Sequence, residues 1–364
     1  ARLGTPSAEV DVPDYLGKNK GKNHYYFLPL ILGLIGMLFH FKQNNQDALA
    51  VLLFFLFTGV LIIIYLNVVP FQPRERDYAY VGSFYAFAIW IGLGVLGIYD
   101  FLSKRLNSTA SAGIATVVAL IIPTLMAAEN WDDHDRSGRF TALEVAKNYL
   151  NSCDKNAILF TNGDNDTFPL WYAQEVEGIR TDIKVVNLSL FNTPWYIDQM
   201  KRASYDAAPI PSSLEHDDYR AGTRDYTPIN ERFKDYVEVK DVVNFINSKS
   251  AKAKINTSAG LRSYCPTKKL KLSVNKENVK AFIPIEYHDK IVDEIKFKLK
   301  GNGLYKNKLM VLDILANFNW ERPIYFAITV GRDNFMGLEK YFQLEGLAYR
   351  LVPYLAKSPD GQTG

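Results

Sequence analysis

The chain has 364 residues, a formal net charge of +3 and a mean hydropathy of −0.10, values typical of a soluble protein. The near-neutral charge balance and the lack of a basic stripe argue against a nucleic-acid-binding protein. The two cysteines, Cys153 and Cys265, lie far apart without CxxC spacing, so the sequence indicates neither a zinc site nor a redox motif. A disulfide between them stays open.

The composition differs sharply between the two parts of the chain. Almost all the strongly apolar sequence precedes Ala128, and almost all the charge follows it. This division predicts that the two parts face two different solvents. The chain begins with ARLGTPS, without an initiator Met or a signal peptide, and it ends in a polar SPDGQTG tail. We therefore expect a piece of a longer protein.

Four apolar segments follow a polar N-terminal arm, residues 1–24. Each segment is close to the roughly 20 residues that an α-helix needs to cross about 30 Å of hydrocarbon. Tyr and Trp cluster near the segment ends, as they do at membrane interfaces. Length and the missing polar stripe disfavour the alternative, four buried helices of a large soluble protein. We predict a transmembrane region over 25–128, with spans at about 25–41, 48–69, 78–101 and 110–128.

The links between these segments are short, which predicts that neighbouring helices are antiparallel. Segments separated by an even number of crossings then share one membrane face. The N-terminal arm, the loop with Arg74 and Arg76, and everything after Ala128 are therefore predicted on one face, and Lys104 and Arg105 on the other. Basic residues occur on both sides, so the positive-inside rule leaves the orientation open.

Residues 129–357 have the pattern of an extramembrane α/β domain, followed by a disordered tail over 358–364. Short apolar runs at 157–163, 183–190 and 323–331 predict buried strands, and a helix between the first two makes a βαβ unit with parallel strands. The predicted fold class is thus a bundle of four transmembrane helices followed by an α/β domain with a largely parallel sheet. Residues 203–265 are predicted to be irregular apart from one helix. Further predictions are a strand at 292–301 and helices at 137–152, 167–176, 194–202, 239–248, 307–320 and 336–352.

The first charged cluster lies between the second and third apolar segments. The stretch PFQPRERDY places Arg74 and Arg76 at the start of the third predicted helix, with prolines that stiffen the link. Arginines at this depth anchor a helix end to headgroup phosphates. A guanidinium also grips a phosphate with two parallel hydrogen bonds, as the binding of a lipid-linked sugar donor requires. Both interpretations stay open.

The second cluster, ENWDDHDRS, follows the fourth segment. Asp132, Asp133, His134 and Asp135 supply hard oxygen ligands and one imidazole, which suit a divalent cation such as Mg²⁺ or Mn²⁺. Contiguous acids cannot all reach one ion. An acidic N-terminal turn of the following helix, stabilised by the helix dipole, is therefore the favoured interpretation.

The third cluster, TNGDNDTFPLW, lies where a buried strand ends and a helix begins, the usual place for ligands in open α/β sheets. Asp164, Asn165 and Asp166 have the D-x-D form with which many nucleotide-sugar transferases hold a metal ion and a diphosphate. The alternative is a turn at Gly163 and a helix capped by Asp166. Capping explains only one of the two acids, so we favour a metal or acceptor site.

Three stretches of the chain resemble one known family. They are QPRERDYAYVGSFYAFAIWIG, ENWDDHDRSGRFTA and LFTNGDNDTFPLWYAQEVEGIRTDIKVVNLSLFNTPWYIDQMK. The family consists of bacterial multi-spanning membrane proteins with a domain-of-unknown-function label, described as protein O-mannosyltransferase-like, and the resemblance covers about Tyr25 to Tyr354. The family is similar to the GT-C glycosyltransferases, which use lipid-phosphate-linked sugars. The resemblance therefore implies a multi-pass protein of the bacterial inner membrane with its α/β domain in the periplasm.

One departure from the family bears on activity. In GT-C enzymes the catalytic acid lies in the first external loop, and no stretch of this chain corresponds to that loop. The resemblance thus implies the C-terminal part of the conserved region, without the expected catalytic residues.

Two hypotheses for the function follow. The first is the C-terminal part of a glycosyltransferase that moves a sugar from a polyprenyl-phosphate-linked donor in the membrane lipid to a protein or glycan acceptor. Arg74 and Arg76 would bind the donor phosphate. Asp164 and Asp166 would bind the acceptor, bind a metal ion or stabilise the turn. The second is a non-catalytic membrane-anchored binding or assembly module. A transporter is disfavoured because charges are nearly absent from the spans.

Overall fold

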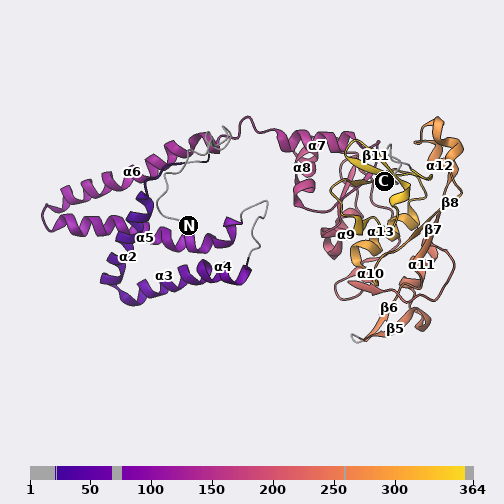
Figure 1. Cartoon of the computed structure of the whole chain (residues 1–364), viewed down its shortest axis with the longest axis horizontal. Helices are drawn as coiled ribbons and strands as arrows, with labels where there is room; N and C mark the ends of the chain where they lie inside the picture. The colour runs from indigo at the N-terminus through magenta and orange to yellow at the C-terminus, as the bar shows by residue number, and fades with distance from the viewer. Residues whose placement is uncertain (1–20, 22, 68–75, 258–259, 357–364) are drawn as a thin grey trace, which may run out of the picture. The chain divides into compact units, whose positions relative to one another are not determined.

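The structure, a computed structural model, describes residues 21, 23–67, 76–257 and 260–356. It contains two compact units, Ala1–Gly138 and Arg139–Gly364, which we describe separately. The first unit is helical and the second is an α/β domain (Figure 1).

The helical unit contains the apolar segments. Its elements are α2 (Leu28–Gln43), α3 (Asn45–Thr58), α4 (Val60–Leu66), the 3-10 helix η1 (Asp77–Tyr80), α5 (Val81–Ser103) and α6 (Ser108–His134).

Three of these stretches are long and apolar enough to cross a membrane. They are Asn45–Leu66, with 22 residues, and Asp77–Ser103 and Ser108–His134, with 27 residues each. α2 has 16 residues and is therefore about 24 Å long, shorter than the roughly 30 Å of hydrocarbon. The unit thus has three to four apolar helices, which indicates a multi-pass membrane protein, and the first predicted span is shorter than expected.

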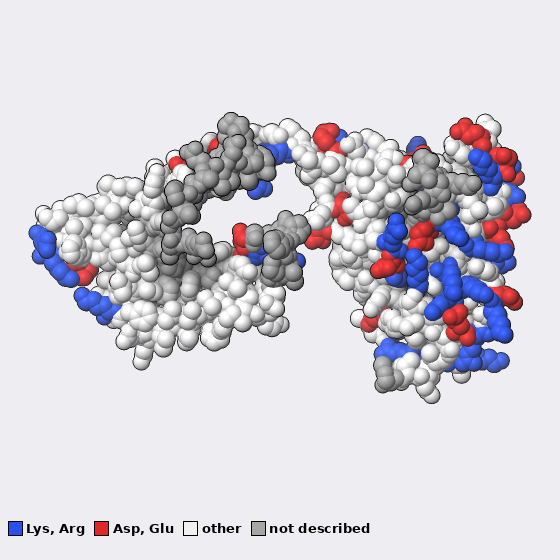
Figure 2. Space-filling view, in the orientation of Figure 1, with Lys and Arg blue, Asp and Glu red and all other residues white. Residues whose placement is uncertain are grey.

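The outer surface of the helical unit is apolar. Leu38, Phe57 and Ile64 are 68%, 59% and 67% exposed. Figure 2 shows broad uncharged faces on this unit, with charged side chains near its ends. An apolar surface of this extent is unusual for a soluble monomer, and contact with lipid accounts for it.

Close backbone contact holds α2 against α5. A Cβ atom on Gly36 would lie 1.8 Å from the carbonyl oxygen of Trp90, and one on Gly94 would lie 2.2 Å from the carbonyl oxygen of Leu32. Only glycine fits at these two positions. Small residues of this kind let membrane helices approach closely, because packing rather than exclusion from water drives their association.

The α/β domain contains the remaining elements. Its helices are α7 (Thr141–Asn151), α8 (Asp164–Glu175), α9 (Pro194–Met200), α10 (His216–Tyr219), α11 (Val239–Asn247), α12 (Lys276–Lys280) and α13 (Lys306–Asn317). Its strands are β1 (Ile158–Thr161), β2 (Lys184–Asn187), β3 (Tyr226–Pro228), β4 (Val237–Glu238), β5 (Lys254–Thr257), β6 (Gly260–Ser263), β7 (Lys269–Ser273), β8 (Glu294–Lys298), β9 (Gly303–Tyr305), β10 (Ile324–Ala327), β11 (Phe342–Glu345) and β12 (Ala348–Leu351). Short 3-10 helices lie at η2 (Leu190–Asn192), η3 (Ala251–Ala253), η4 (Ile285–Lys290), η5 (Arg332–Asn334) and η6 (Glu339–Tyr341).

The main sheet has five strands in the order β11-β12-β10-β1-β2. β1 lies between two parallel neighbours, so that Ile158 is opposite both Lys184 in β2 and Ile324 in β10. These three strands are fully buried, as their continuous apolar runs predict. The predicted βαβ unit, β1-α8-β2, is confirmed.

The prediction of a helix over 336–352 is wrong. This stretch contains η6 and the antiparallel hairpin β11-β12, and Gly346, with a φ of 56°, lies between the two strands. β12 also pairs antiparallel with β10. The hairpin therefore supplies backbone partners to the edge of β10, which local helical spacing could not reveal. The sheet is consequently mixed rather than largely parallel.

The region 203–265 is more ordered than predicted. Besides the expected helix α11 it contains α10 and strands β3 to β6. The strands form small sheets, β3-β9 and β5-β6, and β4 joins β7 and β8. The predicted strand at 292–301 is confirmed as β8.

The two cysteines are not bonded to each other. Cys153 and Cys265 are free thiols in the core, 4% and 0% exposed. Burial raises the pKa of Cys153 to about 12 and that of Cys265 to about 11. Both are therefore neutral, unreactive core residues at physiological pH.

Lys184 is a buried cation in the edge strand β2, 2% exposed. Its Nζ donates to the carbonyl oxygen of Arg202 at 2.7 Å and to Oγ of Ser204 at 2.9 Å. Burial, with a smaller contribution from the charge of Arg322, lowers the pKa of Lys184 to about 8.

This shift predicts a pH dependence of stability. Between about pH 8 and pH 10.4, the ordinary pKa of lysine, the unfolded chain holds a proton at Lys184 that the folded chain has released. The free energy of unfolding should therefore rise with pH across this window by roughly 3 kcal/mol more than in Lys184→Met. Urea unfolding of both proteins from pH 7 to pH 10.5 measures the difference, and parallel curves would contradict the prediction.

Candidate functional site

The turn after β1 carries the third charged cluster. α8 begins at Asp164, and Gly163 occupies the N-cap position with an extended backbone. The prediction that Asp166 caps the helix is therefore wrong, because the helix starts two residues earlier. Both acids still lie in the first turn of α8, where the helix dipole favours negative charge.

Asp166 connects the turn to a strand from a distant part of the chain. Its Oδ2 accepts hydrogen bonds from the backbone N–H of Asn162 at 3.2 Å and from the hydroxyl of Thr329 at 2.6 Å. Thr329 follows β10, the parallel neighbour of β1. Asp166 thus joins the carboxyl ends of two neighbouring strands.

A network of buried hydrogen bonds connects the turn to β1, α8 and β2. The hydroxyls of Thr161 and Thr167 lie 2.7 Å apart, and Nδ2 of Asn187 donates to Thr167 at 2.9 Å and to the carbonyl oxygen of Gly163 at 3.2 Å. Oδ1 of Asn187 accepts from the backbone N–H of Ser189 at 2.8 Å. These polar groups are satisfied although they are buried, so the network fixes the shape of the turn.

The remaining two residues of the D-x-D stretch are exposed. Neither Asp164 nor Asn165 makes a side-chain hydrogen bond within the part of the chain that the structure describes. β1 lies between β2 and β10, so the turn sits where the sheet extends in both directions, the usual ligand position in open α/β sheets. Asp164 and Asn165 are therefore available to a ligand, whereas Asp166 is structurally engaged.

The structure does not group the acids around one point. Within residues 23–67, 76–257 and 260–356, no set of three or more His, Cys, Asp or Glu side chains is arranged to hold a metal ion. A divalent cation at Asp164 and Asp166, or at Asp132, Asp133 and His134, stays a prediction.

The second cluster lies at the end of a helix rather than at the start of one. α6 continues to His134, and α7 begins only at Thr141. The favoured interpretation of Asp132 and Asp133 as an acidic N-terminal turn is therefore wrong. Carboxylates at a helix C-terminus are opposed by the helix dipole, so other contacts must stabilise them.

Those contacts come from the N-terminal arm. Nδ2 of Asn23 donates to Oδ2 of Asp133 at 3.0 Å and to Oδ1 of Asn130 at 2.9 Å. The backbone N–H of His24 donates to Glu129 at 3.1 Å. Nδ1 of His134 lies 2.7 Å from Oδ1 of Asp133. The residues before α2 and the end of α6 thus meet, and their location on one membrane face stays a prediction.

The first cluster is described only in part. Arg74 lies outside the described residues. Arg76 directly precedes η1. Its side chain is exposed and makes no hydrogen bond or ion pair with any residue that the structure describes. α5 and α6 are consecutive and packed against each other (Figure 1). Arg76 precedes η1, which leads into α5, and Asp132 lies in the last turn of α6.

The predicted residues therefore lie in two separate units of the structure. Asp164, Asn165 and Asp166 lie in the α/β domain, and Arg76 and the Asp132–His134 turn lie in the helical unit. Whether all of them face one aqueous compartment stays a prediction. Sequence reasoning missed Asn187 and Thr329. The sequence offered one sign of them: each is a polar residue near the end of a predicted buried strand, Asn187 in β2 and Thr329 after β10.

These features define a multi-pass membrane protein with an appended α/β domain, and comparison with known proteins identifies the domain. The chain belongs to the family TMEM260-associated domain 2, which it matches over residues 142–364. A mouse relative, Protein O-mannosyl-transferase TMEM260, is 24% identical over 115 residues. That similarity covers 32% of this chain and 16% of the relative. No solved structure matches the chain.

Proposed function

We propose that the chain is the C-terminal part of a membrane glycosyltransferase that moves a sugar from a lipid-phosphate donor to an acceptor. One observation carries the proposal: helices apolar enough to span a membrane precede a TMEM260-associated domain whose relative is named a protein O-mannosyl-transferase. A donor with a polyprenyl tail stays in the bilayer. A transferase for it therefore needs a membrane-embedded part and a part that meets the acceptor.

The proposed donor-phosphate ligands are Arg74 and Arg76. The exposed side chain of Arg76, directly before a candidate span, supports this role. Sugar transfer leaves negative charge on the departing phosphate, and a guanidinium stabilises that charge with two parallel hydrogen bonds.

The proposed acceptor-facing group is the D-x-D turn. Asp164 and Asn165 are exposed at the carboxyl end of β1, and Asp166 and Asn187 hold the turn in shape. A carboxylate there suits binding of acceptor hydroxyls, or of Mg²⁺ or Mn²⁺. A bacterial inner-membrane location with a periplasmic domain belongs to the same proposal.

The test replaces the two arginines in membranes of cells that express the protein. With a radiolabelled polyprenyl-phosphate mannose donor, Arg74→Gln/Arg76→Gln should lower mannose transfer by about 100-fold, the usual effect of removing a charge-stabilising donor. The matched control is Lys104→Gln/Arg105→Gln, in the link between α5 and α6, which should keep transfer near the unaltered level. Transfer that survives the first change, or falls equally with both, would remove the proposed role.

A non-catalytic binding module is the second candidate. Two observations favour it: Asp166 is engaged in structural hydrogen bonds, and the described residues contain no metal-binding set. In that case the unaltered chain should transfer no mannose even when its complete protein context is restored.

A further inference from the structure

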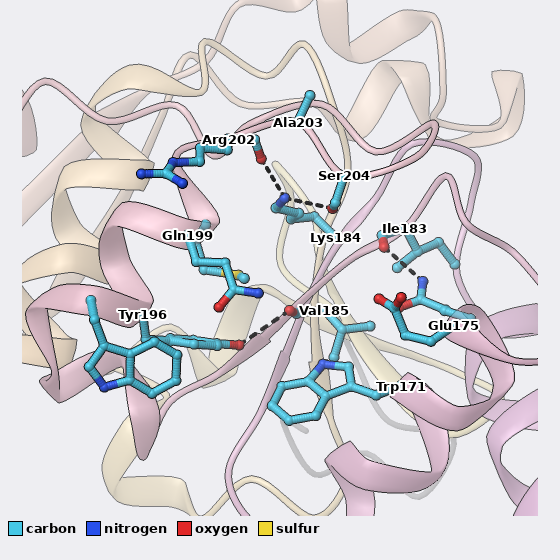
Figure 3. Close-up of a pocket in the computed structure, with 13 residues that line it drawn as sticks. Trp171, Glu175, Ile183, Lys184, Val185, Tyr196, Gln199, Arg202, Ala203 and Ser204 are labelled. Carbon is cyan, nitrogen blue, oxygen red and sulfur yellow. Dashed lines mark hydrogen bonds between the residues drawn. The ribbon is translucent and has the colours of Figure 1, made fainter.

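A pocket of about 420 Å³ lies beside β2 in the α/β domain (Figure 3), and Asp164, Asn165 and Asp166 are not among the residues that line it. β2 is an edge strand of the main sheet, so its outer side is open to this space. α8, α9 and the segment after α9 supply the other walls. The volume falls within the roughly 300–1,000 Å³ typical of small-ligand sites.

Aromatic rings form one wall of the pocket. Trp171, from α8, and Trp195, from α9, both contact Tyr196, with ring centroids 6.4 Å and 5.5 Å away. The Tyr196 hydroxyl accepts from the backbone N–H of Asn187 at 2.9 Å, so this ring is fixed. Trp195 is 57% exposed. An exposed ring beside a cavity offers an apolar face on which a ligand can stack.

Three side chains of the pocket, Glu175, Gln199 and Arg202, end in planar polar groups. One oxygen of Glu175 accepts from the hydroxyl of Tyr205, and its other oxygen has no such partner. The side chains of Gln199 and Arg202 make no hydrogen bond to any residue that the structure describes. In Figure 3 the amide of Gln199 points into the space between Lys184 and Trp171. A carboxylate, an amide and a guanidinium are thus free to bind.

We propose that this pocket binds a hexopyranose unit of a glycan. A pyranose ring has an apolar C–H face, which packs on aromatic rings, and a rim of hydroxyls that both donate and accept. Planar carboxylate, amide and guanidinium groups each bind a pair of neighbouring hydroxyls. A phosphate ligand fits less well, because Lys184 already donates to Arg202 and Ser204 and Arg202 is the one free cation among the described lining residues.

The inference goes beyond the proposed transfer reaction and does not depend on it. The donor-phosphate ligands proposed above lie in the helical unit, whereas every residue of this pocket lies in the α/β domain. A glycan held here would be part of the acceptor or of a neighbouring glycoprotein. An unaltered chain that transfers mannose but binds neither sugar would therefore overturn only the present inference.

The experiment measures sugar binding to the whole chain in lipid nanodiscs, without glucoside or maltoside detergents that would compete. Saturation-transfer NMR with methyl α-D-mannopyranoside and methyl α-D-glucopyranoside should show contact with at least one sugar. Trp195→Ala should weaken binding at least about tenfold, since one stacked ring contributes about 1 kcal/mol or more. Gln199→Ala, a change of an exposed side chain, should weaken it severalfold.

The matched control is Tyr172→Ala. Tyr172 is an exposed aromatic residue of the same helix as Trp171 but does not line the pocket, so binding should be unchanged. Thermal unfolding of each variant confirms that the domain is folded. The inference would be overturned if neither sugar binds the unaltered chain, or if sugar binding persists in both folded variants. It would also be overturned if an aromatic acid such as indole-3-acetate, and neither sugar, binds in a way that depends on Trp195.

Discussion

Arg350→Met is expected to destabilise the α/β domain by about 3–5 kcal/mol, the usual cost of breaking a buried ion pair. Arg350 is 3% exposed. Its guanidinium lies 2.7 Å from Asp154 and 3.2 Å from Glu345, and it donates to the carbonyl oxygen of Phe282 at 2.8 Å. It therefore connects β12 to three other parts of the domain.

Methionine would fill most of the volume but leave Glu345 without a cation. Glu345 also accepts from the hydroxyl of Tyr325 at 2.8 Å, so its charge would be stranded within a largely buried network. Arg350→Lys should recover part of the loss, because an ammonium restores the charge but cannot reach all three partners.

Urea unfolding of the whole chain, followed by pulse proteolysis of the α/β domain, measures this effect. Arg332→Met is the matched control, since the side chain of Arg332 is exposed and makes no hydrogen bond or ion pair within the described residues. It should change the free energy of unfolding by less than about 0.5 kcal/mol. Equal stability of Arg350→Met and Arg332→Met would contradict the structural role of the network.

The second large effect is expected for Asp313→Ala, at about 4 kcal/mol. Asp313 lies in α13 and is 0% exposed. Its carboxylate accepts from the hydroxyl of Ser213 at 2.7 Å, from the backbone N–H of Ser213 at 3.1 Å and from Nδ2 of Asn317 at 2.9 Å. The hydroxyl of Ser212 is a further donor.

Alanine would remove the one acceptor that these donors share and would open a small cavity at a fully buried position of α13. The loss should therefore exceed that of one hydrogen bond, since several hydrogen bonds to a charged acceptor are lost together. Asp313→Asn should be nearly as harmful, because its NH₂ group would face donors rather than accept from them. Asp333→Ala, at an exposed acid of η5, is the control for the same unfolding measurement. A small effect of Asp313→Ala would show that the segment around Ser213 is held by other contacts.

Local sequence patterns predicted the elements whose burial is continuous. The three central strands β1, β2 and β10 were recognisable because both faces of a parallel sheet are covered, which requires an unbroken apolar run. The spans were recognisable because hydrocarbon accepts almost no polar side chains. α2, with 16 residues, shows the limit of this reasoning, since composition marks a helix as apolar but does not fix its ends.

The candidate site was predictable in position but not in its connections. A D-x-D stretch after a buried strand points to the carboxyl edge of a sheet, and the structure places it there. The engagement of Asp166 with Thr329 could not be predicted, because these residues are far apart in the chain and meet only when β1 and β10 pair.

The sequence by itself determined that this protein has apolar helices of membrane-spanning length, a βαβ core and a polar turn at its edge. Each of these features depends on a periodicity or a run of apolar residues that is visible within a short stretch of sequence. Only the tertiary structure decided that 342–351 forms a hairpin, that Asp166 bonds across the sheet and that aromatic rings gather beside β2. Those features depend on backbone and side-chain partners supplied by distant segments, and no local pattern encodes which partner will be present.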